Sequence, residues 1–255
     1  MRTIFRSALN RLNGQPAPHT FSRATFGRTW SLLRSFPLEQ ADPDVFYTGL
    51  ARDTAELIDA LCTDYGVSLH GSRVLDVGGG PGYFTSEFAA RGARYISCEP
   101  GELATDVRGS GMQLPFLDNS CEITYSSNVA EHVPEPWTMA DEMLRVTAPG
   151  GLVVLSYTIW LGPFGGHETG LWQHYVGGEF ARRRYRKKHG HEPKNIFGTS
   201  LFNVSCAEGL RWAESTGQLV LAFPRYHPWW AWWAVRVPLF REFAVSNLVV
   251  VLRKN

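Results

Sequence analysis

Hydrophobic positions along the chain fall into short continuous runs and into longer stretches with helical spacing. The clearest run, residues 74–77, passes into glycines at alternate positions of 78–82, and Phe84 and Phe88 then lie one helical turn apart. Glycine adopts positive φ and lets a ligand approach the backbone, and a helix N-terminus presents unpaired N–H groups. This strand, turn and helix therefore predict a site for a nucleotide-like cofactor.

Later runs predict the rest of a sheet. A second strand is expected to finish at Glu99, and further strands are expected at 121–127, 152–157, 218–223 and 246–253. Helical patterns lie between most of these runs. The order of the patterns is typical of an α/β fold.

Capping residues and charge pairs mark the expected helices. Asp42 is a predicted N-cap, and residues 205–208 have the form of a capping box. The helix before the strand at 152–157 is expected to end at the Pro-Gly-Gly of 149–151. Asp141 and Arg145 are four residues apart on this helix, so they are expected to form an ion pair.

Composition and charge limit the classes of function. A chain of 255 residues with 44% hydrophobic and 19% charged content can bury one large core. The formal net charge of +1 gives no global attraction to nucleic acid, so no specific nucleic-acid partner is expected. The four cysteines form no C-x-x-C pair, so neither a zinc site nor a disulfide framework is indicated. Reduced thiols of this kind are typical of a cytoplasmic protein.

Residues 1–40 are expected to form a basic N-terminal arm ahead of the main domain at 41–255. Six arginines and no acidic residue precede Glu39. An acid-poor N-terminus with arginine and serine is found in organelle transit peptides. The same composition suits a partly helical arm that packs on the domain or touches an anionic surface. The arm is the favoured interpretation, and both stay open.

The spacing of the glycines separates two classes of cofactor. From Gly78 it reads G-x-G-x-G, with Asp76 two residues earlier, whereas the dinucleotide fingerprint is G-x-G-x-x-G. The segment resembles motif I of the class I S-adenosylmethionine (SAM) methyltransferases, and an NAD-type oxidoreductase is disfavoured. The resemblance implies that Asp76, Gly78, Gly80 and Gly82 surround SAM. Glu99 would hold the ribose, because a carboxylate accepts hydrogen bonds from both vicinal hydroxyls.

Three downstream segments continue the resemblance. Segment 108–116 is similar to the part of the family in which an acid contacts the adenine amino group. Ser110 takes the place of that acid, so adenine would be held more by Met112 and by backbone groups. Asn128 follows the strand at 121–127, at the sheet edge where open α/β sheets bind ligands. Run 142–151 resembles the family signature before strand 5.

The resemblance spans residues 73–157 and points to small-molecule methyltransferases of type 11. It implies a Rossmann-like seven-stranded, mostly parallel sheet of order 3-2-1-4-5-7-6, with strand 7 antiparallel and helices on both faces. It implies SAM as the cofactor and a small molecule as the methyl acceptor. A non-catalytic, membrane-associated or partner-binding protein that keeps this fold is the alternative.

Two segments exceed this minimal fold. Residues 159–204 form a long insertion, and loops of this length usually act as lids or binding elements. The insertion carries six Lys or Arg within 182–188, and residues 226–240 carry four tryptophans. Together they favour a lipid-like acceptor and peripheral contact with an anionic membrane. A solvated helix face and packing against the sheet would explain the same residues, and these interpretations stay open.

Histidines are the candidate catalytic bases, because an imidazole titrates near neutral pH and a hydroxyl acceptor must lose a proton. His132 and His167 are chosen by position, and a structural hydrogen bond is the alternative role for His132. Glu131 and His132 also resemble part of the metal-binding E-x-x-E-H of quinone-biosynthesis O-methyltransferases. Asn128 stands where the first acid of that pattern would be, so no bound metal is predicted.

Overall fold

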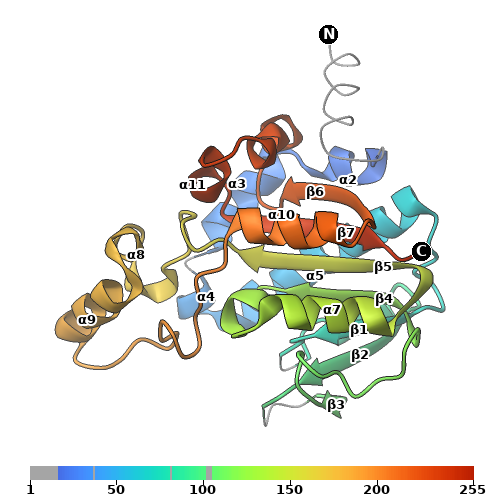
Figure 1. Ribbon diagram of the computed structural model, residues 1–255, viewed down its shortest axis with the longest axis horizontal. Coiled ribbons are helices and arrows are strands. Elements are labelled where there is room, and N and C mark those ends of the chain that lie inside the picture. Colours follow the sequence, from blue (N-terminus) through green and yellow to red (C-terminus); the bar gives the residue numbers. More distant parts are fainter. Residues whose placement is uncertain (1–16, 37, 81, 102–104) are drawn as a thin grey trace.

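A seven-stranded sheet crosses the middle of the molecule, and helices cover both faces (Figure 1). The computed structural model describes residues 17–36, 38–80, 82–101 and 105–255. The strands are β1 (Arg73–Val77), β2 (Arg94–Glu99), β3 (Val107–Arg108), β4 (Cys121–Ser127), β5 (Thr147–Thr158), β6 (Leu219–Pro224) and β7 (Asn247–Arg253). Their order is β3-β2-β1-β4-β5-β7-β6, and β7 runs antiparallel to both of its neighbours. The expected fold class and strand order are confirmed.

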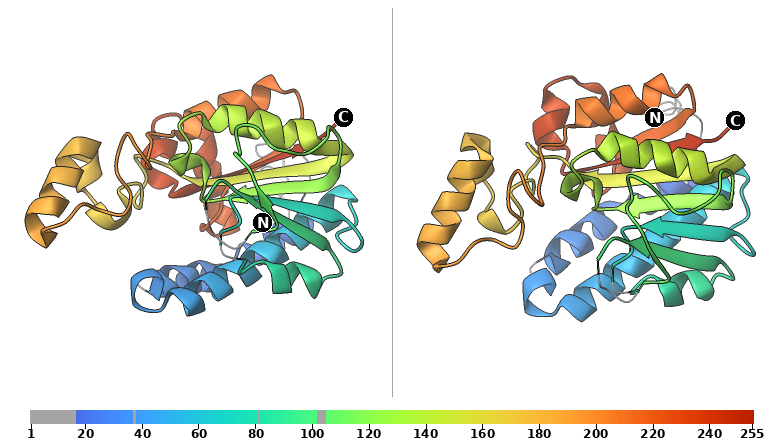
Figure 2. Two further views of the ribbon diagram at one scale, coloured as in Figure 1. Left: turned by 90° about the horizontal axis from the view of Figure 1, so that it is seen from below. Right: turned by 60° about the horizontal axis from the view of Figure 1, so that its bottom comes forward.

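The helices form two layers. They are α2 (Pro18–Arg23), α3 (Phe26–Ser35), α4 (Leu38–Ala41), α5 (Pro43–Tyr65), α6 (Thr85–Ala89), α7 (Pro136–Val146), α8 (Gln173–Val176), α9 (Gly178–His189), α10 (Cys206–Ser215) and α11 (Phe240–Ala244), with the 3₁₀ helices η1 (Ala130–His132), η2 (His167–Thr169) and η3 (Trp229–Arg236). Helices α5 and α6 lie on one face of the sheet, and α7 and α10 lie on the other (Figure 2).

Alternate side chains of the central strands enter two cores. Val74 of β1 belongs to the core that contains Ile58 of α5, and Leu75 belongs to the core that contains Met139 of α7. Successive side chains of a strand point to opposite faces, so a strand covered on both faces has a continuous apolar run. This is why β7 is apolar without a break from Leu248 to Leu252, and why Val74 and Leu75 of β1 are both apolar.

Capping residues confirm the predicted starts of two helices, whereas the start of one strand differs from the prediction. The Asp42 side chain accepts a hydrogen bond from the backbone at the start of α5, and Ser205 and Glu208 form the expected capping box of α10. Strand β5 begins at Thr147 and not at residue 152 as expected. Its pairing with β4 shifts register between Thr147 and Leu152, and the residues between these two form a bulge that belongs to the strand.

The expected ion pair on α7 is wrong. The Arg145 guanidinium instead bonds to Glu142 at 2.7 Å and to Asp118 at 2.6 Å. The Asp141 carboxylate accepts a hydrogen bond from Trp212 Nε1 of α10 at 2.8 Å. Spacing along a helix makes a pair possible, but tertiary neighbours decide which partner each charge meets.

The described part of the basic arm, residues 17–36, packs on the domain. Phe21 of α2 is buried, and its ring centroid lies 4.4 Å from that of Trp232 in η3. Residues 1–16, on which much of the transit-peptide interpretation rests, lie outside the described residues. Within the described ranges, no helix combines the length and the apolarity needed to span a bilayer.

The insertion at 159–204 carries η2, α8 and α9. Helices α8 and α9 project beyond the carboxyl end of β5 (Figures 1 and 2). The segment in which the insertion returns to the domain is held against η1, because Phe202 N–H donates to the Glu131 carbonyl at 2.8 Å. The insertion therefore lies at the sheet edge where parallel α/β folds bind their ligands.

Candidate functional site

The glycine turn after β1 requires conformations that other residues adopt only with strain. Gly78, Gly80 and Gly82 have φ of 89°, 60° and 90°. An ideal Cβ at Gly78 would lie 2.3 Å from Val129 Cγ2, whereas a Cβ at Gly80 would have no neighbour within 4 Å. Gly78 thus packs against the segment after β4. Gly80 faces open space, as a loop that curves around a ligand requires.

Glu99 ends β2 beside this turn. Its Oε1 accepts a hydrogen bond from the Gly80 N–H at 2.8 Å, which holds the carboxylate at the open side of the loop. Its backbone carbonyl accepts from the Gly109 N–H at 3.0 Å and so ties the β2 tip to the following segment. The carboxylate is half-buried and keeps further lone pairs for vicinal hydroxyls of a ribose. Glu99 therefore has the position and the free acceptor sites that the predicted ribose contact needs.

Asp76 lies beneath the loop and not at its surface. The side chain is buried, and Oδ2 accepts hydrogen bonds from the Tyr95 hydroxyl at 2.7 Å and the Tyr125 hydroxyl at 2.5 Å. A Cβ at Gly79 would lie 2.9 Å from the same oxygen. Burial raises the pKa of Asp76 to about 7, although the two tyrosine hydrogen bonds oppose the rise. The Asp76 carboxyl group therefore lies close beneath Gly79 and leaves no room for a side chain there.

Ser110 and Met112 lie in the turn after β3. Ser110 Oγ accepts from the Met112 N–H at 3.2 Å, so this hydroxyl shapes its own turn. A Cβ at Gly111 would lie 3.0 Å from the Met139 side chain and 3.2 Å from Val77 at the end of β1. The turn is therefore packed against the carboxyl end of β1. This is the position expected for residues beside an adenine ring.

Asn128 follows β4 in the left-handed conformation, with φ of 57°. Its N–H donates to the Ser156 carbonyl at 2.8 Å, and its Oδ1 accepts from Asn247 Nδ2 at 2.7 Å. Asn247 Oδ1 in turn accepts from Ser156 Oγ. A non-glycine residue with positive φ is uncommon and is found where the surroundings hold it in place.

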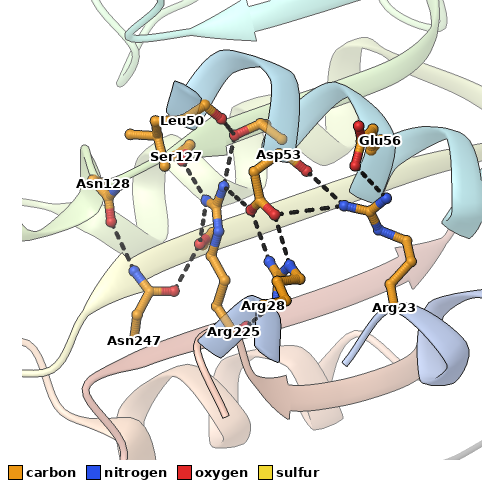
Figure 3. A network of polar contacts seen from close by, with 11 residues as sticks. Arg23, Arg28, Leu50, Asp53, Glu56, Ser127, Asn128, Arg225 and Asn247 are labelled. Carbon is orange, nitrogen blue, oxygen red and sulfur yellow. Dashed lines mark hydrogen bonds and ion pairs between the residues drawn. The ribbon is translucent and has the colours of Figure 1, made fainter. Parts of the chain in front are cut away.

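Behind Asn128 lies a buried charge network that the sequence patterns do not reveal (Figure 3). Arg225, which is 1% exposed, donates to Ser127 Oγ at 2.6 Å and to Thr54 Oγ1 at 2.6 Å. Asp53 lies 3.5 Å from Arg225 and accepts two hydrogen bonds from Arg28, at 2.6 and 2.7 Å. Helix α3, helix α5 and the residue that follows β6 thus meet behind the end of β4, although they are distant in sequence.

The ionic state of Asp53 is set by that network. Burial raises its pKa, but the hydrogen bond from Arg28 and the charges of Arg28, Arg225 and Arg23 outweigh burial and lower the pKa below its usual value. Asp53 is therefore ionised at neutral pH. In the sequence, the only sign of this cluster is the acidic residue Asp53 on a helix face that is otherwise apolar.

The two candidate histidines come together although they are distant in sequence. The ring centroids of His132 and His167 lie 5.1 Å apart, nearly edge to face. His132 Nδ1 lies 2.6 Å from the Ser200 carbonyl, and His167 Nδ1 lies 3.2 Å from the Gly165 carbonyl. A carbonyl oxygen only accepts, so each Nδ1 carries a proton, and in the neutral form of either ring the lone pair is on Nε2. Both imidazoles are half-buried.

The candidate site residues therefore meet at one edge of the sheet. Val129, which contacts Gly78, also accepts the His132 N–H at 2.8 Å through its carbonyl. Val129 thus links the cofactor loop to His132. A surface cavity of about 420 Å³ lies at the start of α7, lined in part by Trp137 and Phe202, and the described residues of the glycine loop do not line it.

Comparison with known proteins agrees with this geometry. The methyltransferase domain family matches residues 75–155. An uncharacterized methyltransferase of Mycobacterium marinum is 59% identical over 244 residues, which cover 90% of this chain and 95% of that protein. One of Mycobacteroides abscessus is 57% identical over 248 residues, covering 91% and 95%.

A solved structure shares the fold. The S-adenosylmethionine-dependent methyltransferase of Mesorhizobium loti superposes with a TM-score of 0.51 at 17% identity, covering 78% of this chain and 98% of that one. Three findings agree on the family: the relatives that match over nearly their full length are methyltransferases, the matching domain is a methyltransferase domain, and the strand order is the one expected for it. The chain belongs to the class I S-adenosylmethionine-dependent methyltransferase family, and S-adenosylmethionine is its cofactor.

Proposed function

We propose that the protein transfers the methyl group of SAM to a small, lipophilic acceptor that it reaches at an anionic lipid surface. The observation that carries the acceptor class is a group of exposed apolar side chains on or directly next to α3, α8, η3 and α11. We call it the apolar rim; it comprises Trp30, Phe36, Trp172, Tyr175, Trp233 and Phe243. Contiguous exposed apolar surface is typical of binding sites for apolar partners.

The apolar rim joins segments that are remote in sequence. The rings of Phe36 and Phe164 lie 4.7 Å apart and connect the end of α3 to the insertion. The rings of Tyr175 and Phe243 lie 6.2 Å apart and connect α8 to α11. Trp30 is 53% exposed, so large apolar groups on this side remain in contact with water. Helices α8 and α11 lie at the end of the molecule to which β5 points (Figure 1).

Basic residues accompany the apolar rim. The Arg184 guanidinium lies over the Trp172 ring, 5.2 Å from its centroid. Arg182 pairs with Glu192, so part of the charge of α9 is neutralised within the protein, while the Lys187 and Lys188 side chains are exposed. Exposed cations beside indole rings suit a surface of anionic headgroups above apolar chains.

Different residues of the site have different roles in methyl transfer. Bound SAM supplies a methyl group on a positively charged sulfur, and methyl transfer removes that charge. Gly80 and Glu99 hold the nucleoside and fix its direction, which aligns the reactants. We propose that Asn128 and Met112 complete the cofactor site. For a hydroxyl acceptor, the free Nε2 of His132 or His167 takes the proton.

Transfer of label from SAM tests the acceptor class. The full chain is incubated with methyl-labelled SAM and a fractionated bacterial extract, and label is expected in the lipid fraction. The Gly80→Asp variant is the control, because a side chain at Gly80 enters the open space of the cofactor loop without a clash in the protein. Label in protein, RNA or polar metabolites, absent with the variant, would contradict the lipophilic acceptor while leaving methyl transfer in place.

A further inference from the structure

Glu131, His132 and His167 form a compact cluster of metal-ligating side chains at the end of β4. Each offers one ligand atom, and the three atoms lie within 4.8 Å of one another. We propose that the cluster binds a divalent transition-metal ion, such as Zn²⁺, through one carboxylate and two imidazoles. The ion would lie beside the cofactor loop, because Val129 links η1 to Gly78.

The hydrogen bonds of both imidazoles leave the same ring nitrogen available for a metal. His132 and His167 each direct Nδ1 at a backbone carbonyl, of Ser200 and of Gly165, at 2.6 and 3.2 Å. Metal-binding histidines commonly donate the other ring N–H to a carbonyl or carboxylate, which fixes the tautomer and the ring orientation. The hydrogen bonds of this cluster follow that arrangement. Nε2 is left as the ligand atom in both rings.

Glu131 provides a buried oxygen without a hydrogen bond. The residue is 1% exposed. One oxygen, Oε1, accepts from the Thr158 N–H at 3.1 Å, but Oε2 is buried and has no hydrogen-bond partner among the described residues. A buried carboxylate oxygen without a partner is costly, and buried charges are normally paired or bound to metal. A cation between Glu131 and the two imidazoles would satisfy this oxygen.

The backbone at His167 supports the same conclusion. His167 has φ of 48°, a left-handed conformation that a residue with a Cβ adopts at some cost. It lies in the short helix η2, between Gly165 and Glu168. The Glu168 carboxylate accepts from the Asn195 backbone and side chain at 2.6 and 2.9 Å, which holds this turn within the insertion. The turn directs the imidazole toward His132.

The ligand set defines the class of ion. Two imidazoles and one carboxylate suit Zn²⁺, Fe²⁺ and related ions, and three protein ligands leave a coordination position open. Ligand atoms around tetrahedral Zn²⁺ lie roughly 3.3 Å apart, as follows from bond lengths near 2 Å. A separation at the upper limit of 4.8 Å would therefore have to shorten by about 1.5 Å on binding. If the proposed function holds, an Nε2 atom bound to the ion cannot take the acceptor's proton, and the ion replaces it in that role: the open position would receive the acceptor oxygen and lower the pKa of its hydroxyl.

The sequence could not reveal this site. Asn128 replaces the first acid of the E-x-x-E-H pattern, which is why the sequence predicts no metal. The third ligand, His167, comes from the insertion. Its distance along the sequence from Glu131 and His132 matches no known ligand spacing, so the sequence does not connect the three residues.

Metal binding is measured on the full chain without SAM or acceptor, so the result does not depend on methyl transfer. Chelator-treated protein is titrated with Zn²⁺ by calorimetry and with Co²⁺ by visible absorption. We expect one ion per chain. The variants His132→Gln and His167→Gln should bind it far more weakly, by more than the roughly 10- to 100-fold that losing an outer-shell partner costs.

The matched control removes two imidazoles elsewhere. The His189→Gln, His191→Gln double variant loses an exposed pair at the end of α9, and it should bind Zn²⁺ like the unaltered chain. His167 lies in a surface turn, so its variant is expected to fold; a thermal melt checks this. Absence of binding to the unaltered chain, or equal binding by a folded His167→Gln variant, would overturn the proposal.

Discussion

At the scale of single residues, two positions next to β1 hold the cofactor loop by opposite means. Gly78 has no side chain, so the segment after β4 packs directly on its backbone. Asp76 has a carboxyl group that is buried under the loop and held by Tyr95 and Tyr125. The first effect is steric and independent of pH, whereas the second depends on protonation.

Asp76 should make folding stability depend on pH. Its folded pKa of about 7 exceeds the value near 3.9 of an unfolded aspartate, so the folded state holds the proton more tightly. The resulting stability is complete below about pH 4 and is lost as the pH rises toward 7, by a few kcal/mol. Urea unfolding at pH 5 and pH 8 measures this loss.

The Asp76→Asn variant is the comparison, because the amide oxygen still accepts from both tyrosines and carries no titrating proton. The fall in unfolding free energy from pH 5 to pH 8 should be smaller in the variant. An equal fall in the two proteins would show that Asp76 is ionised in the folded state at both values.

Gly78→Ala should both destabilise the protein and weaken SAM binding. The new Cβ meets the Val129 side chain, and φ at this position is 89°. Overpacking and backbone strain of this kind cost about 1–3 kcal/mol. Gly49→Ala in α5 is the control, since its Cβ has no neighbour within 4 Å and alanine favours a helix by about 0.5–1 kcal/mol. Thermal unfolding of the two variants should shift in opposite directions.

At the scale of elements, the Arg225 network joins α3 and α5 to the carboxyl ends of β4 and β5. Asp53→Asn should cost about 3–5 kcal/mol, because Arg225 would then be buried without its carboxylate. Glu179→Gln on α9 is the control: its pair with Arg183 is exposed, and its loss should cost less than about 1 kcal/mol. Similar unfolding free energies for both variants would contradict the importance given to the network.

Elements with local signals could be predicted, and those that depend on tertiary partners could not. The glycine turn, Glu99 and the caps at Asp42 and Ser205 follow from spacing within one segment. The start of β5, the partners of Arg145 and the Arg225 network depend on chains that meet only in the fold. The meeting of His132 with His167 belongs to the second kind, although each residue was chosen by its position in the sequence.

At the scale of the whole molecule, the apolar rim and the basic helix α9 predict binding to anionic lipid. Replacing Arg183, Lys187 and Lys188 by glutamine should weaken binding to phosphatidylserine-containing vesicles by up to about 3 kcal/mol, at about 1 kcal/mol per basic residue. Vesicle flotation measures this. Binding to neutral vesicles is the control and should change little. Equal flotation of both proteins on anionic vesicles would mean that α9 is only a solvated helix.

The central claim is that the loop at 78–82 and Glu99 form a SAM site. Calorimetric titration of the full chain with SAM tests it most directly, alongside Glu99→Ala and Gly80→Asp. We predict saturable binding by the unaltered chain, weaker binding by Glu99→Ala, which loses the ribose contact, and none by Gly80→Asp. No binding by the unaltered chain at millimolar SAM, or identical titrations for all three proteins, would contradict the account.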